Sequence, residues 1–388
     1  MPVPTPRLAI TLGDPRGIGP EVARAALAAP GIEATLVGPD DLVAGAAAAH
    51  VEGVGPWDGG GAGEDAVVRA GRLTGRAVEA AVRLWRDGRV DAIVTGPGDK
   101  RALNAAGYRF PGHTELLREL TGAKQVAMML ASDRLRVVLV TTHLPLRDAL
   151  SILTPERIVD VGRVTRSFLT SWFGLAEPRL ALCALNPHAG EGGLFGHEEE
   201  RVLRPAAAQL GIAGPLPADT VFVRAMRGEF DAVLAPYHDV GMTAIKVASF
   251  GRAVNVTLGL PVPRTSPDHG TAMDIAGRGV ADPSSMIEAV KVAGEIVKRL
   301  RGGDEVMRAG LQSAVCRLEA AVRSPPLITS SHHHLHHFLT SPLGTYLAVP
   351  TRRPSMVTIS NAPPSTGTTS PGFGSRPSFP NRYPPSVA

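Results

Sequence analysis

The chain has 388 residues, of which 44% are hydrophobic, 20% charged and 4% aromatic, so it is long enough for a large core and more than one domain. Its formal net charge is +4, but residues 323–388 contain five arginines and no other charged side chain, which leaves residues 1–322 with a net charge of −1. A nearly neutral body without an apolar run of 18 residues argues against a nucleic-acid partner and against a membrane-spanning helix.

Short β-branched runs alternate with helical stretches along residues 1–322, a pattern typical of parallel strands joined by crossover helices. The predicted strands are residues 8–12, 35–37, 92–95, 126–130, 137–141, 180–184, 232–235 and 254–258. The predicted helices are residues 21–29, 71–87, 154–168, 198–210 and 283–301. Because this α/β body exceeds one comfortable core, we expect two lobes with a central cleft.

The composition changes at Ser324. Residues 324–388 hold 12 of the 34 prolines, have no acidic residue and show no apolar periodicity, so we expect this tail to be disordered. It contains five histidines, which indicate either a metal-scavenging tract or, as we favour, a tag-like tail with incidental nickel affinity: His332, His333, His334, His336 and His337.

The cysteines and the N-terminal residues bear on the cellular compartment in which the protein is expected to function. Cys183 and Cys316 are too few for a disulfide framework, which favours a reducing environment. Asp14 interrupts the first apolar run, so the N-terminus does not look like a secretory signal. We therefore expect a cytoplasmic protein.

A glycine-rich turn, GDPRGIGPE, follows the first predicted strand and opens a helix at residues 13–21. Its spacing is not GxGxxG, and a strand-to-helix turn without a ligand explains it equally well. The rest of the sequence has no Rossmann fingerprint either. A nicotinamide nucleotide would therefore have to bind by another architecture.

Five histidines lie in turn-like polar settings: His113, His143, His188, His238 and His269. Each one alone is more often an ordinary loop histidine than a ligand. Three of them, His143, His188 and His238, directly follow predicted strands. Imidazole nitrogens from separate strand ends can converge on one divalent ion and leave positions open for a substrate, so the sequence predicts a metal site there.

Cationic and amide side chains follow the last of these histidines. Lys246, Asn255 and Arg264 flank an apolar strand, and their donors suit a phosphate or carboxylate group. Arg252 lies in the same stretch, and we interpret it as a surface residue. From the residues alone we expect metal-assisted oxidation of a small anionic hydroxy acid.

The successive motifs resemble those of the 4-hydroxythreonine-4-phosphate dehydrogenase family, in family order from residue 7 to about residue 302. They read GDPRGIGPE, TGPGDK, GHTE, TTHLPLRD, NPHAGEGGLFGHEE, PADTVF, YHDVGM and GRAVNVTLGLPVPRTSPDHGTAMDIAGRG. The resemblance implies an isocitrate/isopropylmalate dehydrogenase-like α/β fold, which would explain the missing fingerprint. It also implies lobes at residues 1–115 with 262–323 and at residues 116–261.

The resemblance implies roles for individual residues. His143, His188 and His238 become the metal ligands for zinc, magnesium or cobalt, one of them supplied by the other subunit of a homodimer whose active site lies at the subunit interface. The implied substrate contacts are His113, Thr114, Lys246, Asn255 and Arg264, of which Lys246 and His113 are the implied catalytic residues. The implied contacts to NAD or NADP are His269, Gly270, Thr271 and Asp274.

The expected reaction is oxidation of 4-phosphohydroxy-L-threonine followed by decarboxylation, in pyridoxine 5'-phosphate biosynthesis. Gly98 and Asp99 stand where the motif often has a bulkier residue and Asn or His, and Val240 stands where Gln is common. These departures leave open related dehydrogenases of phospho-D-threonate, phosphoerythronate or a dihydrodiol. A phosphate acyltransferase or a metal hydrolase is a further alternative, and neither would reduce NAD.

Overall fold

A computed structural model describes residues 4–58 and 63–302 of the chain, and these residues belong to one compact unit. The predicted disorder of residues 324–388, the histidine tract within them and Cys316 all lie outside the described residues. Within the described part of the chain, no helix combines the length and the apolar character needed to cross a membrane.

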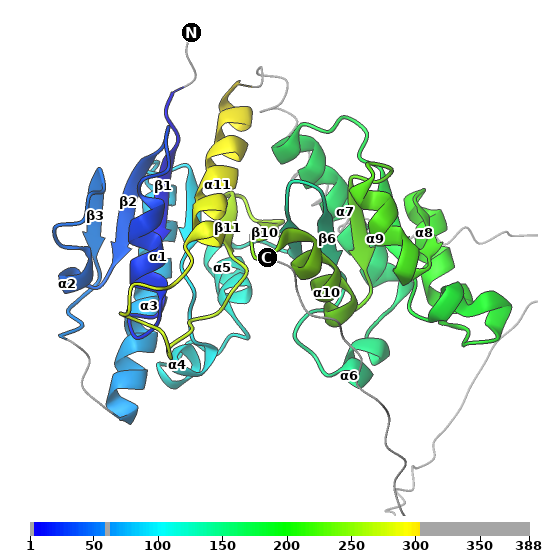
Figure 1. The fold of residues 1–388 in the computed structure, drawn as a ribbon, viewed down its shortest axis with the longest axis horizontal. Helices are drawn as coiled ribbons and strands as arrows, with labels where there is room; N and C mark the ends of the chain where they lie inside the picture. Colours follow the sequence, from blue (N-terminus) through cyan, green and yellow to red (C-terminus); the bar gives the residue numbers. More distant parts are fainter. Residues whose placement is uncertain (1–3, 59–62, 303–388) are drawn as a thin grey trace, which may run out of the picture. The chain divides into compact units, whose positions relative to one another are not determined.

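The described residues form one eleven-stranded sheet with the order β3-β2-β1-β4-β11-β10-β5-β6-β9-β7-β8. The strands labelled in Figure 1 follow this order from β3 to β6. The strands are β1 Arg7–Thr11, β2 Glu33–Gly38, β3 His50–Gly53, β4 Ala92–Thr95, β5 Ala127–Ala131, β6 Arg136–Leu139, β7 Leu180–Cys183, β8 Ala213–Leu216, β9 Ala232–Ala235, β10 Val254–Leu258 and β11 Arg264–Pro267. All eight predicted strands are present, and their bounds agree with the prediction to within two residues.

The expected parallel pairing does not hold at the centre of the sheet. Strand β10 is antiparallel to both β11 and β5, and β5 is antiparallel to β6. The reason is the length of the connections, because only residues 259–263 join β10 to β11 and only residues 132–135 join β5 to β6. A parallel crossover needs a dozen or more residues, whereas such short links can only turn the chain back.

The two predicted lobe ranges occupy the two halves of this sheet. Residues 1–115 and 262–323 contribute β1 to β4 and β11, and residues 116–261 contribute β5 to β10. The sheet runs without interruption through both halves, and the division into lobes stays a prediction.

Eleven α-helices accompany the strands in the described residues. They are α1 Gly19–Ala26, α2 Asp40–Val43, α3 Glu64–Arg86, α4 Lys100–Ala105, α5 His113–Thr121, α6 Leu146–Ser151, α7 Pro155–Phe173, α8 Arg204–Leu210, α9 Ala218–Met226, α10 His238–Ser249 and α11 Ser284–Gly302. A 3-10 segment, η1 (Pro187–Gly193), and a π-helical turn, η2 (Glu199–Leu203), lie between β7 and α8. The predicted helix at residues 198–210 therefore begins as a π-helical turn.

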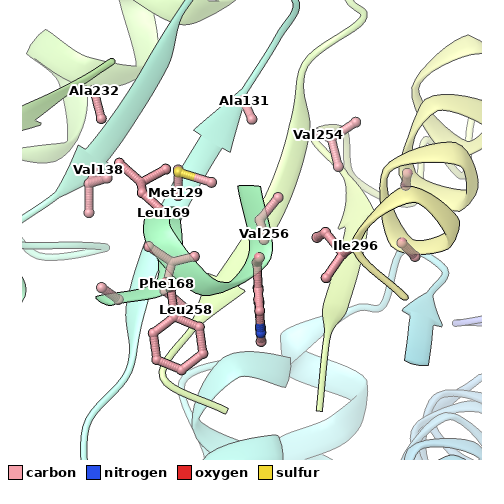
Figure 2. Packing of buried hydrophobic residues seen from close by; sticks show 14 of the residues in the cluster. Met129, Ala131, Val138, Phe168, Leu169, Ala232, Val254, Val256, Leu258 and Ile296 are labelled. Atoms are coloured by element: carbon pink, nitrogen blue, oxygen red, sulfur yellow. The ribbon is translucent and has the colours of Figure 1, made fainter. Parts of the chain in front are cut away.

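The alternation of side chains along the strands divides the core between the two faces of the sheet. In β1, Leu8 and Ile10 belong to a buried cluster that includes residues of α1, α7 and α11, whereas Ala9 belongs to a second cluster with α3 and α5. Figure 2 shows part of the first cluster, with Phe168 of α7 beside the central strands. Burial on both faces explains why β5, β7 and β9 read as continuous apolar runs.

Candidate active site

His143 and His238 meet because the strands that precede them are parallel neighbours, β6 and β9. Beyond the ladder, Val140 N–H donates to the carbonyl of Ala235, and the Thr141 hydroxyl donates to the carbonyl of Pro236 at 2.8 Å. These bonds tie the two strand ends together. The imidazole centroids of His143 and His238 are 5.3 Å apart, with ring planes at 45°.

A hydrogen bond orients the ring of His238, and the ring of His143 is partly buried. Nδ1 of His238 lies 2.7 Å from Oδ1 of Asp239, and because a carboxylate only accepts, Nδ1 donates this hydrogen bond and Nε2 takes no part in it. Burial, together with the charges of Lys100 and His238, lowers the pKa of His143, which is therefore neutral at pH 7. Two imidazoles this close fit one divalent ion in donor chemistry.

His188 does not join this pair within one chain. It lies in η1 with its side chain 67% exposed, and its Nδ1 is 3.1 Å from Oε2 of Glu191, which again leaves Nε2 available. Among the described residues no three His, Cys, Asp or Glu side chains form a group suited to a metal. A single chain therefore brings together two of the three predicted ligands.

Arg264 is a buried cation, and it forms no ion pair with a carboxylate among the described residues. The residue is 3% exposed at the start of β11, and its guanidinium donates to the hydroxyls of Thr257 (2.9 Å) and Thr95 (2.5 Å). Its Nε is buried without a partner in the described residues. Burial lowers the pKa of Arg264 to about 10, so the group stays charged at pH 7 and suits an anion.

His113 begins α5 close to this cation. Burial first, and then the charges of Arg264 and Lys100, lower the pKa of His113 to about 3, so its ring is neutral and not a counter-ion for phosphate. Its Nε2 is buried without a partner in the described residues. A Cβ added at Gly98 would lie only 2.3 Å from Cε1 of His113, so Gly98 leaves the ring room that a larger residue would take. Thr114 follows His113 and is buried.

Asn255 and Lys246 occupy neighbouring parts of the same region. Oδ1 of Asn255, in β10, is buried without a partner in the part of the chain that the structure describes. Nζ of Lys246, in α10, donates to the carbonyl of Asp268 at 3.2 Å and lies 3.8 Å from its Oδ2. Asp268 thus holds the lysine where β11 ends.

The predicted nucleotide segment continues from Asp268 and lies beside the glycine-rich turn. Ile18 N–H donates to the carbonyl of Thr271 at 2.9 Å, and Gly279 N–H donates to Glu21 at 3.1 Å. Nδ1 of His269 is 3.0 Å from the carbonyl of Gly270, and its Nε2 is buried without a described partner. Asp274 is exposed. The turn and the segment therefore form one surface, and their role in cofactor binding stays a prediction.

Two features of this region escaped the sequence reasoning. Lys100, at the start of α4, acts electrostatically on both His113 and His143, and its only signal was the last letter of the TGPGDK motif. Arg16 forms a bidentate pair with the fully buried Asp14 and also reaches Asp99 at 3.2 Å. Asp99, a departure from the usual motif, thus has a structural partner in this chain.

Imidazoles at adjacent strand ends, a buried cation and unpartnered polar atoms on an α/β sheet are the kinds of group that enzymes use to bind small anionic substrates. Residues 54–293 match the family model described as "Pyridoxal phosphate biosynthetic protein PdxA", and the chain belongs to this family. The predicted family is confirmed.

Named relatives and a solved structure agree with this assignment. The chain is 44% identical to the 4-hydroxythreonine-4-phosphate dehydrogenase of Geobacter metallireducens over 331 residues, which cover 77% of this chain and 97% of that protein. It is 49% identical to the D-threonate 4-phosphate dehydrogenase of Cupriavidus necator over 239 residues, 59% of this chain and 71% of that protein. The crystal structure of 4-hydroxythreonine-4-phosphate dehydrogenase from Klebsiella pneumoniae aligns with a TM-score of 0.67 at 38% identity, covering 75% of this chain and 99% of that one. The α/β fold class is thereby confirmed, and the family is one of oxidoreductases.

Proposed function

We propose that the chain is an NAD(P)-dependent, divalent-metal-assisted dehydrogenase that oxidises 4-phosphohydroxy-L-threonine and releases carbon dioxide to give 3-amino-2-oxopropyl phosphate, in the cytoplasm, for pyridoxine 5'-phosphate biosynthesis. The observation that carries the proposal is the buried guanidinium of Arg264, whose Nε has no described partner. A buried cation without a direct carboxylate partner is costly, although the charge of Glu115 acts favourably on Arg264, and an anionic ligand such as the phosphate or carboxylate of the substrate would offset this cost. The names of the relatives supply the particular substrate.

Substrate binding follows from the unpartnered atoms. Arg264 offers Nε and further N–H donors to an anionic group, and Nε2 of the neutral His113 exchanges one hydrogen bond with a polar group of the substrate. Thr114, Asn255 and Lys246 add the remaining contacts. Because Arg264 and Thr114 are buried before the substrate arrives, little ordering of these two side chains accompanies binding.

The metal is held by His143 and His238 of one chain together with His188 of a second copy, in a homodimer whose active site lies at the subunit interface. Zinc, magnesium or cobalt bound there would lower the pKa of the substrate hydroxyl and stabilise negative charge on the same oxygen. The exposure of His188 and the free Nε2 that Glu191 leaves on it support this sharing.

The chemistry balances as a two-electron oxidation. NAD or NADP, held along His269, Gly270, Thr271 and Asp274, would take up hydride from the carbinol carbon, while the hydroxyl proton would be released to water. The resulting β-keto acid loses carbon dioxide, and a proton then returns to the carbon. Lys246 is the donor of the returning proton, because Asp268 holds its ammonium at the edge of the substrate site.

A second substrate, D-threonate 4-phosphate, is favoured by one specific feature. Gly98 lies against His113, and Asp99 pairs with Arg16, where the family motif often has larger or different residues. The relative from Cupriavidus necator named for that substrate is 49% identical over 239 residues. A pocket altered beside His113 would change which polar group His113 meets.

Turnover of the two substrates decides between them. Purified protein is mixed with a divalent metal, NAD or NADP and each substrate in turn, and formation of the reduced cofactor is monitored by its absorbance. We expect a higher kcat/KM for 4-phosphohydroxy-L-threonine than for D-threonate 4-phosphate. A higher kcat/KM for D-threonate 4-phosphate would assign the chain to that branch. No reduced cofactor with either would favour the hydrolase or acyltransferase alternative, although Cys183 is no candidate nucleophile there because burial raises its pKa to about 12.

A further inference from the structure

The segment that carries His188 has an unusual backbone. Residues 188–192 of η1 all have positive φ, and three of them, His188 (φ 51°), Ala189 (56°) and Glu191 (40°), are not glycine. Left-handed conformations of such residues persist only where the surroundings fix them. The side chain of His188 is largely exposed, and its described contacts are with the exposed side chains of Glu191 and Phe195, so buried contacts of the flanking main chain are the stronger constraint.

One buried carboxylate contacts the chain on both sides of His188. Glu199, at the start of η2, is 1% exposed. Its Oε1 accepts hydrogen bonds from the backbone N–H groups of Leu185 (2.9 Å) and Asn186 (2.6 Å), and its Oε2 accepts one from Nδ2 of Asn186 (2.9 Å). A carboxylate is an acceptor-only group with room for several donors, which suits it to this role.

The same carboxylate limits the segment after His188. A Cβ added at Gly190 would lie 2.9 Å from Oε2 of Glu199, so the backbone of Gly190 packs directly on the carboxylate. Gly190 is buried and has φ +79°. Glu199 thus fixes the chain two residues before His188 and two residues after it.

We propose that Glu199 is a positioning residue that holds residues 185–190 in the conformation presenting His188 to the metal of a second copy of this chain. This role rests on the proposed function, because it requires His188 to be a metal ligand. In this role Glu199 contacts neither the substrate nor the metal, and it acts only through the conformation of residues 185–190.

The test compares Glu199→Gln with Glu198→Gln. Glu198 is the matched control, since it is exposed and also accepts from Nδ2 of Asn186, at 2.8 Å, but does not touch the backbone of residues 185 and 186. All variants are made in the full-length chain with the five tail histidines between 332 and 337 replaced by alanine, so that this tract does not compete for the metal. Dissociation constants for Co²⁺ are measured by titration, together with the visible spectrum of the bound ion and hydrogen exchange of residues 185–197.

We expect Glu199→Gln to weaken Co²⁺ binding about 10- to 100-fold, the range seen when outer-shell partners of ligands are lost, and to change the Co²⁺ spectrum as a ligand is lost. Exchange across residues 185–197 should rise. Glu198→Gln should change the dissociation constant by less than about threefold. Equal affinities for Glu199→Gln and the unsubstituted chain would overturn the proposal.

A double-mutant cycle separates positioning from a general structural role. If Glu199 acts through His188, adding Glu199→Gln to His188→Ala causes no further loss of affinity, whereas a full additive loss would contradict the proposal. If His188→Ala alone leaves Co²⁺ affinity unchanged, the shared metal site of the proposed function fails and the positioning role fails with it. If His188→Ala weakens binding but Glu199→Gln does not, only the positioning role fails.

A second variant, Asn186→Ala, tests the same role if Glu199→Gln does not fold. Asn186→Ala removes one of the three hydrogen bonds to Glu199 and leaves the carboxylate in place. It should weaken Co²⁺ binding severalfold in the unsubstituted chain and not at all in His188→Ala. Unchanged affinity in the first background would overturn the proposal.

Discussion

Replacing Arg264 by lysine tests whether the buried guanidinium binds the anionic end of the substrate. Of the five N–H donors of an arginine, Arg264 uses one for Thr257 and one for Thr95, and Nε is free within the described structure. A lysine has three donors. With two of them held by the same threonines, the variant keeps its charge but can offer only one donor, and it loses the bidentate fork.

The expected loss is therefore one charge-assisted hydrogen bond. Such a bond contributes about 1.5–3 kcal/mol. Since each 1.4 kcal/mol is roughly a factor of ten, the KM for the substrate should rise by about 10- to 150-fold. Metal affinity should not change, because Arg264 is not a ligand.

Steady-state kinetics and a metal titration check this result. Arg252→Lys is the control, because Arg252 is exposed, and it should leave KM within about twofold. Circular dichroism confirms that both variants are folded. If Arg264→Lys is folded and its KM matches that of the unsubstituted chain, the anion site does not include Arg264.

Four further substitutions test neighbouring parts of the site. His143→Ala should lower metal affinity by about 100-fold with little change in the thermal midpoint, since His143 is not part of the buried core, and retained metal would reject the ligand assignment. Gly98→Ala puts a Cβ 2.3 Å from Cε1 of His113, so the ring must move and KM should rise; an unchanged KM would mean that His113 does not contact the substrate. Lys100→Gln should raise KM by about tenfold. The control is Arg101→Gln, which replaces an exposed neighbouring cation and should leave KM unchanged, and equal effects of the two substitutions would show that Lys100 is not part of the site. The pKa of His113 is about 3 in the fold and about 6.5 in the unfolded chain, so the unfolded state binds the proton first and acid destabilises the protein. His113→Gln should therefore reduce the loss of unfolding free energy between pH 7 and pH 5 by up to about 2 kcal/mol in urea titrations, and an unchanged loss would show that the ring is protonated in the fold.

The strands could be predicted where burial on both faces leaves a β-branched or apolar run, as in β9 and β10. Strand β3 (His50–Gly53) is largely exposed, β8 (Ala213–Leu216) contains glycine and proline, and β11 (Arg264–Pro267) contains an arginine and a proline, so none of the three has that signal. Their pairing comes from neighbours distant in sequence. Periodicity alone does not report such partners.

Some residues of the candidate site could also be predicted from the sequence, and others could not. His143 and His238 were accessible from sequence, because each follows a strand and parallel strands that are neighbours end together. The sequence did not single out Glu199, because its contacts are hydrogen bonds from the backbone N–H groups of Leu185 and Asn186, which lie 14 and 13 residues earlier in the chain. Only the three-dimensional structure shows that a glutamate in an acidic run is buried.

Subunit complementation tests most directly the central claim that two copies of the chain complete one dehydrogenase site. His143→Ala and His188→Ala are each expected to be inactive, and co-expressing the two variants produces mixed dimers. In a mixed dimer one site has both defects and the other has none, so random pairing should restore about a quarter of the normal activity per subunit, measured as NADH or NADPH formation. A co-expressed sample that contains mixed dimers yet stays as inactive as either variant alone would show that His143 and His188 act in the same chain, and would contradict the shared site.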